Sequence, residues 1–466
     1  MVQVPILSGI TTARSADFVR SYPVNLDPHV EAGGTDGTGI SRGYLKLCAG
    51  VRTVAQGGPD RGGHVWRGGH YRVLGSTFHR VGEDGELSAL GDVGPGGRVV
   101  FAESFDRLAV ASRGRLHYWN GSALSTVTDP DLGDVRSLAW SDGYFLTTDG
   151  TSIVATELND PTAVDPLKYG SSEADPDPVM GLLALRGIVY ALNRHSIEAF
   201  ENAGTTGFPF RRNRGSQIPK GCVGASAFCP FIETFAFVGS ARNEPPGVYL
   251  AGAGQAIPIA PGEVADDLAA LSPDELAGVE METVAIGGAV RLLVHLPART
   301  WVYHWTASQQ LDTPVWSVRA GGADLDRAYP ARGFTWHDGR WWCGSDAGVG
   351  VVDEAAATLF GEAFGWRFDT PLIYNGGAGA VVHALDLVTL GGRGPSATIW
   401  ESHTDDGATW SAERPSSAGR IGERSARPAW RRLGRMRHWR GFRFRGVAQA
   451  PVAFARLEAT LEPLGG

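Results

Sequence analysis

Cysteine is scarce in this chain of 466 residues. Its four cysteines are too few and too widely spaced for a disulfide framework in a protein of this size, so we expect buried free thiols. No segment approaches the roughly 20 apolar residues that a membrane-spanning helix needs. The N-terminus has neither the basic region nor the extended apolar segment of a signal peptide. We therefore expect a protein made in the cytosol, without disulfides and without a membrane span.

Lysine is scarcer still, since arginine supplies 39 of the 42 basic residues. The arginines gather near the C-terminus, where residues 411–445 hold eleven arginines and two glutamates, a net charge of +9. Because the whole chain carries −8 at pH 7, the remaining residues together carry −17. Such an asymmetry indicates either a site for a polyanion or a surface that meets an acidic partner.

The common sequence motifs of catalysis are missing. The chain has no Gly-x-x-x-x-Gly-Lys-Ser/Thr loop and no Gly-x-Ser-x-Gly turn, and residues 252–257 fall short of a Gly-x-Gly-x-x-Gly loop. The twelve histidines form no compact ligand set such as His-Glu-x-x-His. The sequence therefore predicts neither an enzyme nor a bound metal or cofactor.

Glycine, by contrast, is abundant, with 64 residues where average usage of roughly 7% would give about half as many. Many follow Asp or Asn between short apolar runs, as at Asp142-Gly143. Such dipeptides favour tight hairpins because both turn residues adopt positive φ. The hairpins group into degenerate units of roughly 35 to 45 residues, a period typical of propeller blades. We predict an all-β fold with about six blades, and seven as the next choice.

Three regions follow from these patterns. We expect residues 1–45 to form an irregular N-terminal arm, residues 46–364 a propeller-like body, and residues 365–466 an arginine-rich β-sandwich-like domain. One short helical insertion is expected near residues 262–278. Its signal is a capping box formed by Ser272 and Glu275, with a proline at the first helical position.

The segment Asp405-Asp-Gly-Ala-Thr-Trp410 resembles the Asp-box hairpin of sialidases and other β proteins, although His403 stands where that motif has serine. In those families the box braces a turn, and we expect the same structural role here. Together with the Trp-rich strands, however, the box leaves an alternative open, a sialidase-like glycosidase or a glycan-binding propeller.

A series of short segments in a fixed order spans nearly the whole chain. The segments are Tyr22–Asn25, Gly43–Leu45, Asp134–Arg136, Ser196–Glu198, Pro219–Cys222, Gly247–Leu250, Gly252–Ala256, Gly278–Thr283, His295–Pro297 and Trp430–Arg435. Together they resemble the packaged-DNA stabilisation protein of short-tailed bacteriophages, a family also called the tail accessory factor, tail hub or nozzle.

The resemblance implies a structural virion protein without catalytic residues. In this family six copies form a ring below the portal and its adaptor, continue the DNA channel and retain the packaged DNA. The ring receives a needle or plug, with tailspikes or fibres docked alongside. We accordingly expect a homo-hexamer in the virion tail, and we expect the protein to be in the host cytoplasm during assembly. Phage DNA would pass through its channel without sequence-specific binding.

The arginine cluster then needs an interpretation. In Gly441–Arg445 the alternation predicts that Phe442 and Phe444 face inward while Arg443 and Arg445 face outward. A conduit must let DNA slide, and every neutralised phosphate adds affinity, so a phosphate-binding groove would hinder it. We therefore predict that the arginine cluster is a protein-docking surface. A DNA-binding module remains the third possibility, after the tail protein and the glycosidase or glycan-binding propeller. The candidate residues of the docking surface are Arg431, Arg432, Arg435, Arg437, Arg443 and Arg445.

Overall fold

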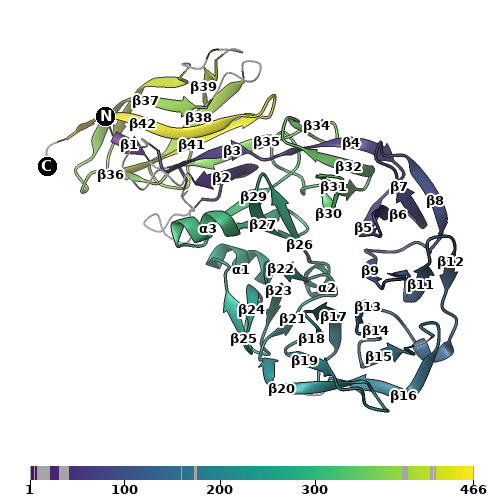
Figure 1. Ribbon diagram of the computed structural model, residues 1–466. Helices are drawn as coiled ribbons and strands as arrows, with labels where there is room; N and C mark the ends of the chain where they lie inside the picture. Colours follow the sequence, from purple (N-terminus) through teal and green to yellow (C-terminus); the bar gives the residue numbers. More distant parts are fainter. Residues whose placement is uncertain are drawn as a thin grey trace.

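Almost all regular structure in the chain is β-strand, and the strands form two bodies, a ring of small sheets and a two-sheet sandwich beside it (Figure 1). The computed structural model describes residues 2–4, 6–7, 21–30, 41–158, 160–172, 176–390, 397–419, 423 and 427–464. The predicted all-β propeller with a sandwich is confirmed.

The ring contains seven sheets within the described residues. The inner strands of each sheet contact the neighbouring sheet, and these contacts continue around a closed circle. Blades one to six are antiparallel sheets of strands that are consecutive in the sequence, as the hairpin signals predicted. The first three blades are β5 (Asp60–Trp66), β6 (Gly69–Leu74), β7 (Thr77–Val81) and β8 (Leu87–Asp92); β9 (Val100–Glu103), β10 (Leu108–Ser112), β11 (Arg115–Trp119) and β12 (Leu124–Thr126); and β13 (Ser137–Ser141), β14 (Tyr144–Thr148), β15 (Ser152–Thr156) and β16 (Val164–Ser171).

Blades four to six continue the same order. They are β17 (Val179–Leu185), β18 (Ile188–Asn193), β19 (Ile197–Asn202) and β20 (Phe210–Ile218); β21 (Gly221–Cys222), β22 (Phe228–Phe231), β23 (Thr234–Ser240), β24 (Gly247–Gly252) and β25 (Gln255–Pro258); and β26 (Glu280–Ile286), β27 (Ala289–His295), β28 (Thr300–His304) and β29 (Trp316–Arg319).

The seventh blade joins strands from distant parts of the chain. Its inner strands come from one segment, but the next strand outward, β4, precedes the first blade in the sequence and pairs antiparallel with β32. This pairing closes the ring. It also corrects the expected count of about six blades, since no local hairpin signal connects β4 to β32. The strands are β30 (Arg332–His337), β31 (Arg340–Ser345), β32 (Gly348–Asp353), β4 (Gly50–Gln56), β33 (Thr358–Leu359) and β34 (Glu362–Ala363).

The predicted helical insertion is present as two short helices, α1 (Gly262–Ala269) and α2 (Pro273–Ala277). The capping box at the start of α2 is confirmed, because Ser272 accepts a hydrogen bond from the backbone of Glu275 and the Glu275 side chain bonds back to Ser272. A third helix, α3 (Trp305–Leu311), was not expected. It follows directly on the strand that ends at His304.

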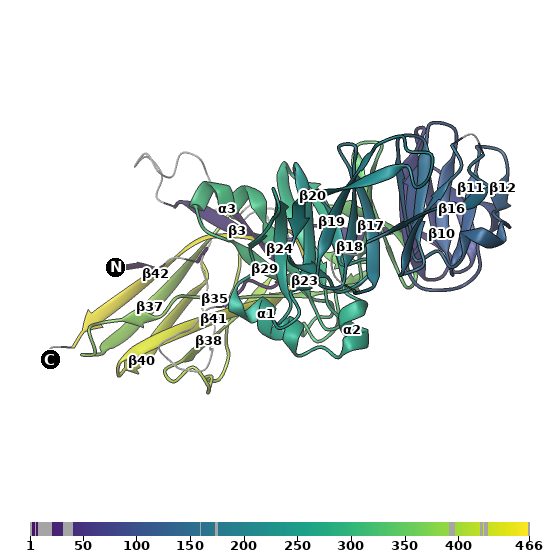
Figure 2. The ribbon, with the colours of Figure 1, turned by 90° about the horizontal axis from the view of Figure 1, so that it is seen from below.

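The sandwich stacks two sheets around a core rich in aromatic side chains, including the fully buried Phe442 and Phe444. Viewed from below, its strands project away from the edge of the propeller (Figure 2). One sheet contains β1 (Val2–Val4), β2 (Leu26–Val30), β3 (Gly43–Leu47), β42 (Ala453–Pro463), β37 (Ala380–Thr389) and β40 (Ala429–Met436); the other contains β35 (Gly365–Asp369), β36 (Ile373–Tyr374), β41 (Trp439–Val447), β38 (Thr398–Thr404) and β39 (Arg414–Ser417).

The sandwich also corrects the view of residues 1–45 as an irregular arm. The described parts of this region supply β1, β2 and most of β3 to the sheet that contains β42. The Gly/Thr/Asp-rich stretch at residues 33–39 lies outside the described residues. Beyond β3 the chain passes almost directly into β4, so the N-terminal segment belongs to both bodies (Figure 1).

Candidate functional site

The backbone around Val24 joins the two bodies. The Val24 amide donates to the carbonyl of Arg367 on β35 at 2.8 Å, and the next amide, that of Asn25, donates to Val318 on β29 at 2.8 Å. The Asn25 side chain donates to the carbonyls of Ala320 and Gly365 at 2.8 and 2.7 Å. Asn25 has φ of 56°, a conformation that Asn tolerates better than most residues. It therefore fastens blade six to the sandwich.

A buried ionic cluster reinforces this junction from the next strand. Asp27 on β2 is only 6% exposed and forms ion pairs with Arg291 on β27, at 3.1 Å, and with Arg319 on β29. Burial alone would raise the pKa of Asp27, but Arg291 and Arg319 hold it well below its ordinary value. Burial lowers the pKa of the adjacent His304 to about 3, so this imidazole is neutral at pH 7.

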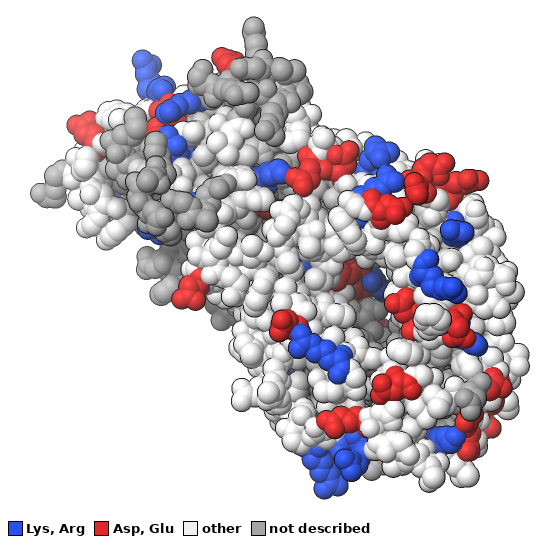
Figure 3. Space-filling model, viewed as in Figure 1, with Lys and Arg blue, Asp and Glu red and all other residues white. Residues whose placement is uncertain are grey.

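Ion pairs also cross the centre of the propeller. Arg98, just before the inner strand of blade two, binds Glu280 at 2.5 Å and Glu282 at 2.7 Å, both on the inner strand of blade six. Glu282 also accepts from the backbone of Gly333 in blade seven at 2.7 Å. Acidic and basic side chains meet at the hollow in the middle of the ring (Figure 3). The axis of a single propeller is therefore bridged by charged side chains.

The arginine-rich strands show the predicted division into two faces. On β41, Phe442 and Phe444 are fully buried in the sandwich core, while Arg443 and Arg445 lie on the opposite face. That opposite face is partly turned towards the propeller, because Arg443 lines a pocket between the two bodies. The alternation was right, but an outward side chain on this strand is not necessarily exposed to solvent.

Three of the six candidate docking arginines have carboxylate partners within the chain. Arg443 forms a two-bond pair with Asp369 at 2.9 and 2.8 Å, and its guanidinium stacks on Trp410. Arg445 pairs with Glu413, and Arg431 with Asp386. Arg432, Arg435 and Arg437 are exposed, and in the part of the chain that the structure describes none of them has an ion-pair partner.

These three arginines lie on or just beyond β40, an edge strand of its sheet. The backbone of this edge is already occupied. Arg414 donates to the carbonyls of Arg431 and Arg432, and Arg440 donates to those of Leu433 and Arg435. Capped carbonyls do not recruit another strand, and a bulge at Arg432 further distorts the edge. Binding here would use guanidinium groups rather than strand addition.

The Asp-box has the structural role that we expected. Asp406 accepts from the backbone amides of Ala408 and Thr409, at 2.9 and 2.7 Å, and so braces the turn. Asp405 forms a two-bond pair with the buried Arg440, with both distances 2.6 Å. Both carboxylates are thus engaged in holding the hairpin, and nothing in this geometry favours the glycosidase alternative.

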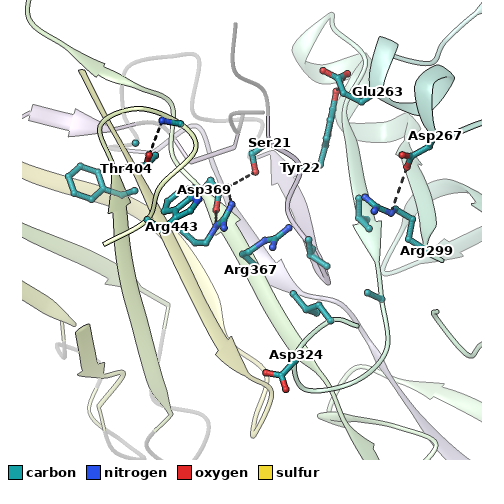
Figure 4. A pocket seen from close by; sticks show the side chains of 18 of the residues that line it. Ser21, Tyr22, Glu263, Asp267, Arg299, Asp324, Arg367, Asp369, Thr404 and Arg443 are labelled. Atoms are coloured by element: carbon teal, nitrogen blue, oxygen red, sulfur yellow. Dashed lines mark hydrogen bonds and ion pairs between the residues drawn. The ribbon is translucent and has the colours of Figure 1, made fainter. Parts of the chain in front are cut away.

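A pocket of about 560 Å³ lies between blade six and the sandwich (Figure 4). Tyr22 from the N-terminal segment and Glu263 from α1 line one side, where the tyrosine hydroxyl donates to the carboxylate at 2.9 Å. Arg367 and Asp369 on β35 line the other side. We did not predict this site; the signal that could have found it is the alternation of Trp366 and Phe368 with Arg367 and Asp369, which places the charged pair on one face of β35.

Neither a metal centre nor a membrane helix is identified among the described residues. No group of three or more His, Cys, Asp and Glu side chains is arranged there to hold a metal ion. No helix in those parts of the chain is long and apolar enough to cross a bilayer. The four cysteines are free and buried.

Comparison with solved structures includes distant likenesses. The N-terminal domain of Nup159 is 10% identical, covers 72% of this chain and 99% of its own, and gives a TM-score of 0.41. The Neurospora crassa Pan2 WD40 domain is 11% identical, covers 66% of this chain and 92% of its own, and gives a TM-score of 0.40. Scores this low carry no argument about function.

Comparison with protein families is more specific. Residues 2–357 match the family model described as Bacteriophage P22 Gp10, beta-propeller, and residues 365–462 match Bacteriophage P22 Gp10, beta-sandwich. The tail hub protein gp10 of Salmonella phage P22 is 27% identical over 489 residues, which covers 99% of each chain. The matches run through both bodies in order, and the chain therefore belongs to the P22 Gp10 family of bacteriophage tail proteins.

Proposed function

We propose that this protein is the hub, or nozzle, of a short phage tail. Six copies would form a ring below the portal and adaptor, continue the DNA channel, retain the packaged DNA and dock a needle with tailspikes or fibres. The observation that carries the proposal is the match to a tail hub protein over 99% of both chains. Its site of action would be the virion tail, with assembly in the host cytoplasm.

Charged side chains at the centre of the propeller bear on where DNA could pass. Arg98 bridges blades two and six through Glu280 and Glu282, so ion pairs cross the axis of one propeller. A DNA channel would therefore have to form between copies arranged in a ring. Outside residues 411–445 the chain carries −17, and a wall of that sign would repel phosphates and let DNA slide.

The three unpaired arginines of β40 and its following turn support a docking role. Arginine binds carboxylates with two parallel hydrogen bonds, and a desolvated pair of this kind gives orientation as well as affinity. Arg432, Arg435 and Arg437 present such groups beside an edge whose carbonyls are capped. We propose that they bind acidic side chains of a neighbouring tail component or of another copy.

Reconstitution tests the proposal. The purified protein is mixed with its portal–adaptor complex and imaged by electron microscopy, with a ring of density below the adaptor as the expected result. The variant R432Q/R435Q/R437Q should weaken or abolish the ring. The control R80Q/R115Q/R214Q removes the same charge from exposed propeller positions and should assemble normally. Absence of any added density with the unmodified protein would refute the hub proposal.

A further inference from the structure

The pocket between blade six and the sandwich contains an arginine that has no ion-pair partner among the described residues. Arg367 extends from β35 into the space between the two bodies (Figure 4). Its Nε atom is buried and makes no hydrogen bond, and its guanidinium has no carboxylate partner within the described ranges. A buried donor that lacks an acceptor is costly, more so when it is charged, so native structures rarely leave one unused.

Two carboxylates beside Arg367 are already bound by other groups. Asp369 accepts both bonds of Arg443, together with a hydrogen bond from Ser21 at 3.1 Å. Asp267 accepts from the Trp301 indole at 2.9 Å and faces Arg299 at 3.7 Å. In Figure 4 these two pairs lie on either side of Arg367. The exposed Asp324 and Asp326 also line the pocket, without an ion pair to Arg367. Among the described residues that line the pocket, Arg367 is thus the arginine without an ion-pair partner.

The electrostatic surroundings agree with this arrangement. Burial, together with the nearby Arg443 and Arg299, holds the pKa of Arg367 below its ordinary value. An arriving anion would reverse this effect by pairing with the guanidinium. The pocket is also far larger than a single carboxylate and is lined by the partly buried rings of Trp410 and Trp439. A ligand that fills it needs an apolar part beside the charged group.

We propose that this pocket is a docking site for a protein segment that presents a carboxylate to Arg367 and an adjacent apolar side chain to Trp410 and Trp439. The carboxylate would accept two hydrogen bonds from the guanidinium, the geometry that arginine favours. Seated between β35 and blade six, such a segment would also lock the angle between the two bodies. The site does not depend on the hub function, and either proposal can fail while the other stands.

Two matched peptides test the site on the full-length protein. Acetyl-Phe-Glu-amide carries both features, whereas acetyl-Phe-Gln-amide lacks only the charge. Calorimetric titration should show the Glu peptide binding roughly tenfold or more tightly, the range expected for a hydrogen bond to a charged group. In R367M this preference should disappear. It should persist in the control R80M, which removes an exposed arginine of blade one.

Further titrations with other anions distinguish the possible ligands. Equal affinity for succinate would overturn the assignment to a protein segment, and equal affinity for inorganic phosphate would overturn the assignment to a carboxylate. Without ligand, R367M should melt at the same temperature as the unmodified protein or higher, because a buried unpaired charge is removed. A clear loss of thermal stability in R367M, or equal binding of the two peptides, would show that Arg367 is a structural residue.

Discussion

Replacing Asp27 with Asn should weaken the attachment of the N-terminal segment to blade six and so lower the free energy of unfolding. The substitution preserves shape but removes the charge that Arg291 and Arg319 face in a site where all three side chains are buried. Removing one partner of a buried ion pair typically costs about 3–5 kcal/mol, because the remaining charge stays desolvated without compensation. With two arginines left facing one amide, we expect D27N to fall in the upper part of that range.

The assay is equilibrium unfolding in urea, followed by far-ultraviolet circular dichroism at pH 7. The control D346N removes a carboxylate from an exposed hairpin turn and should change the free energy of unfolding by less than about 0.5 kcal/mol. The double variant D27N/R319Q should be less destabilised than the sum of its single variants, because the two side chains interact directly. A D27N variant within about 1 kcal/mol of the unmodified protein would refute the reasoning.

The pH dependence provides a second check on Asp27. Its pKa in the folded protein lies below its ordinary value of 3.8, so its contribution is fully present above pH 4. The contribution is lost as the pH falls below that value, where the unfolded chain binds the proton first. The difference between the unmodified protein and D27N should therefore be constant from pH 7 to about 5 and shrink only in stronger acid.

Three further predictions concern separate features. N25A should lower the free energy of unfolding by about 2–4 kcal/mol, because it removes buried hydrogen bonds and places alanine at positive φ. N25G should lower it less, because glycine tolerates that φ, and equal losses in urea unfolding would exclude backbone strain as a factor. Burial lowers the pKa of His304 to about 3 and that of His70 to about 2, so the free energy of unfolding should fall as the pH drops below about 6.5. H304Q should reduce the slope of this decrease by up to about 1.4 kcal/mol per pH unit, and an unchanged slope would contradict the reasoning. The four buried cysteines should not react with a thiol reagent until the protein unfolds. Burial raises the thiol pKa to about 11 for Cys48 and to about 12 for Cys222, and rapid labelling of the folded protein would be inconsistent with this burial.

Local features were predictable where neighbouring residues carry the signal. The turn at Asp142-Gly143 has positive φ at both residues, as its dipeptide indicated. The capping box at Ser272 begins a helix because its two hydrogen bonds connect residues three apart. The alternation at Phe442 and Phe444 gave the buried face of β41. Each of these depends on backbone geometry within a few residues.

Features that join distant segments were not predictable. The strand β4 completes the seventh blade, although almost 300 residues separate it from β32, and no pattern in either strand specifies the pairing. In the N-terminal region β2 pairs locally with β3, but a two-stranded hairpin is marginally stable on its own, and this pair joins the sheet because β3, like β1, pairs with the distant β42. For the same reason the sequence could not show which arginines find carboxylates.

The sequence by itself determined the kind of fold, its turns and faces, and the charge asymmetry, because periodicity and turn chemistry act over short distances. Its ordered segments also led to the family to which the chain belongs. The tertiary structure alone decided the closure of the ring, the joint at Asn25 and Asp27, and the division of the arginines into paired and free. Charges interact according to their separation in space, and only folding sets the separation between Arg443 and Asp369, or leaves Arg367 without an ion-pair partner among the residues that the structure describes.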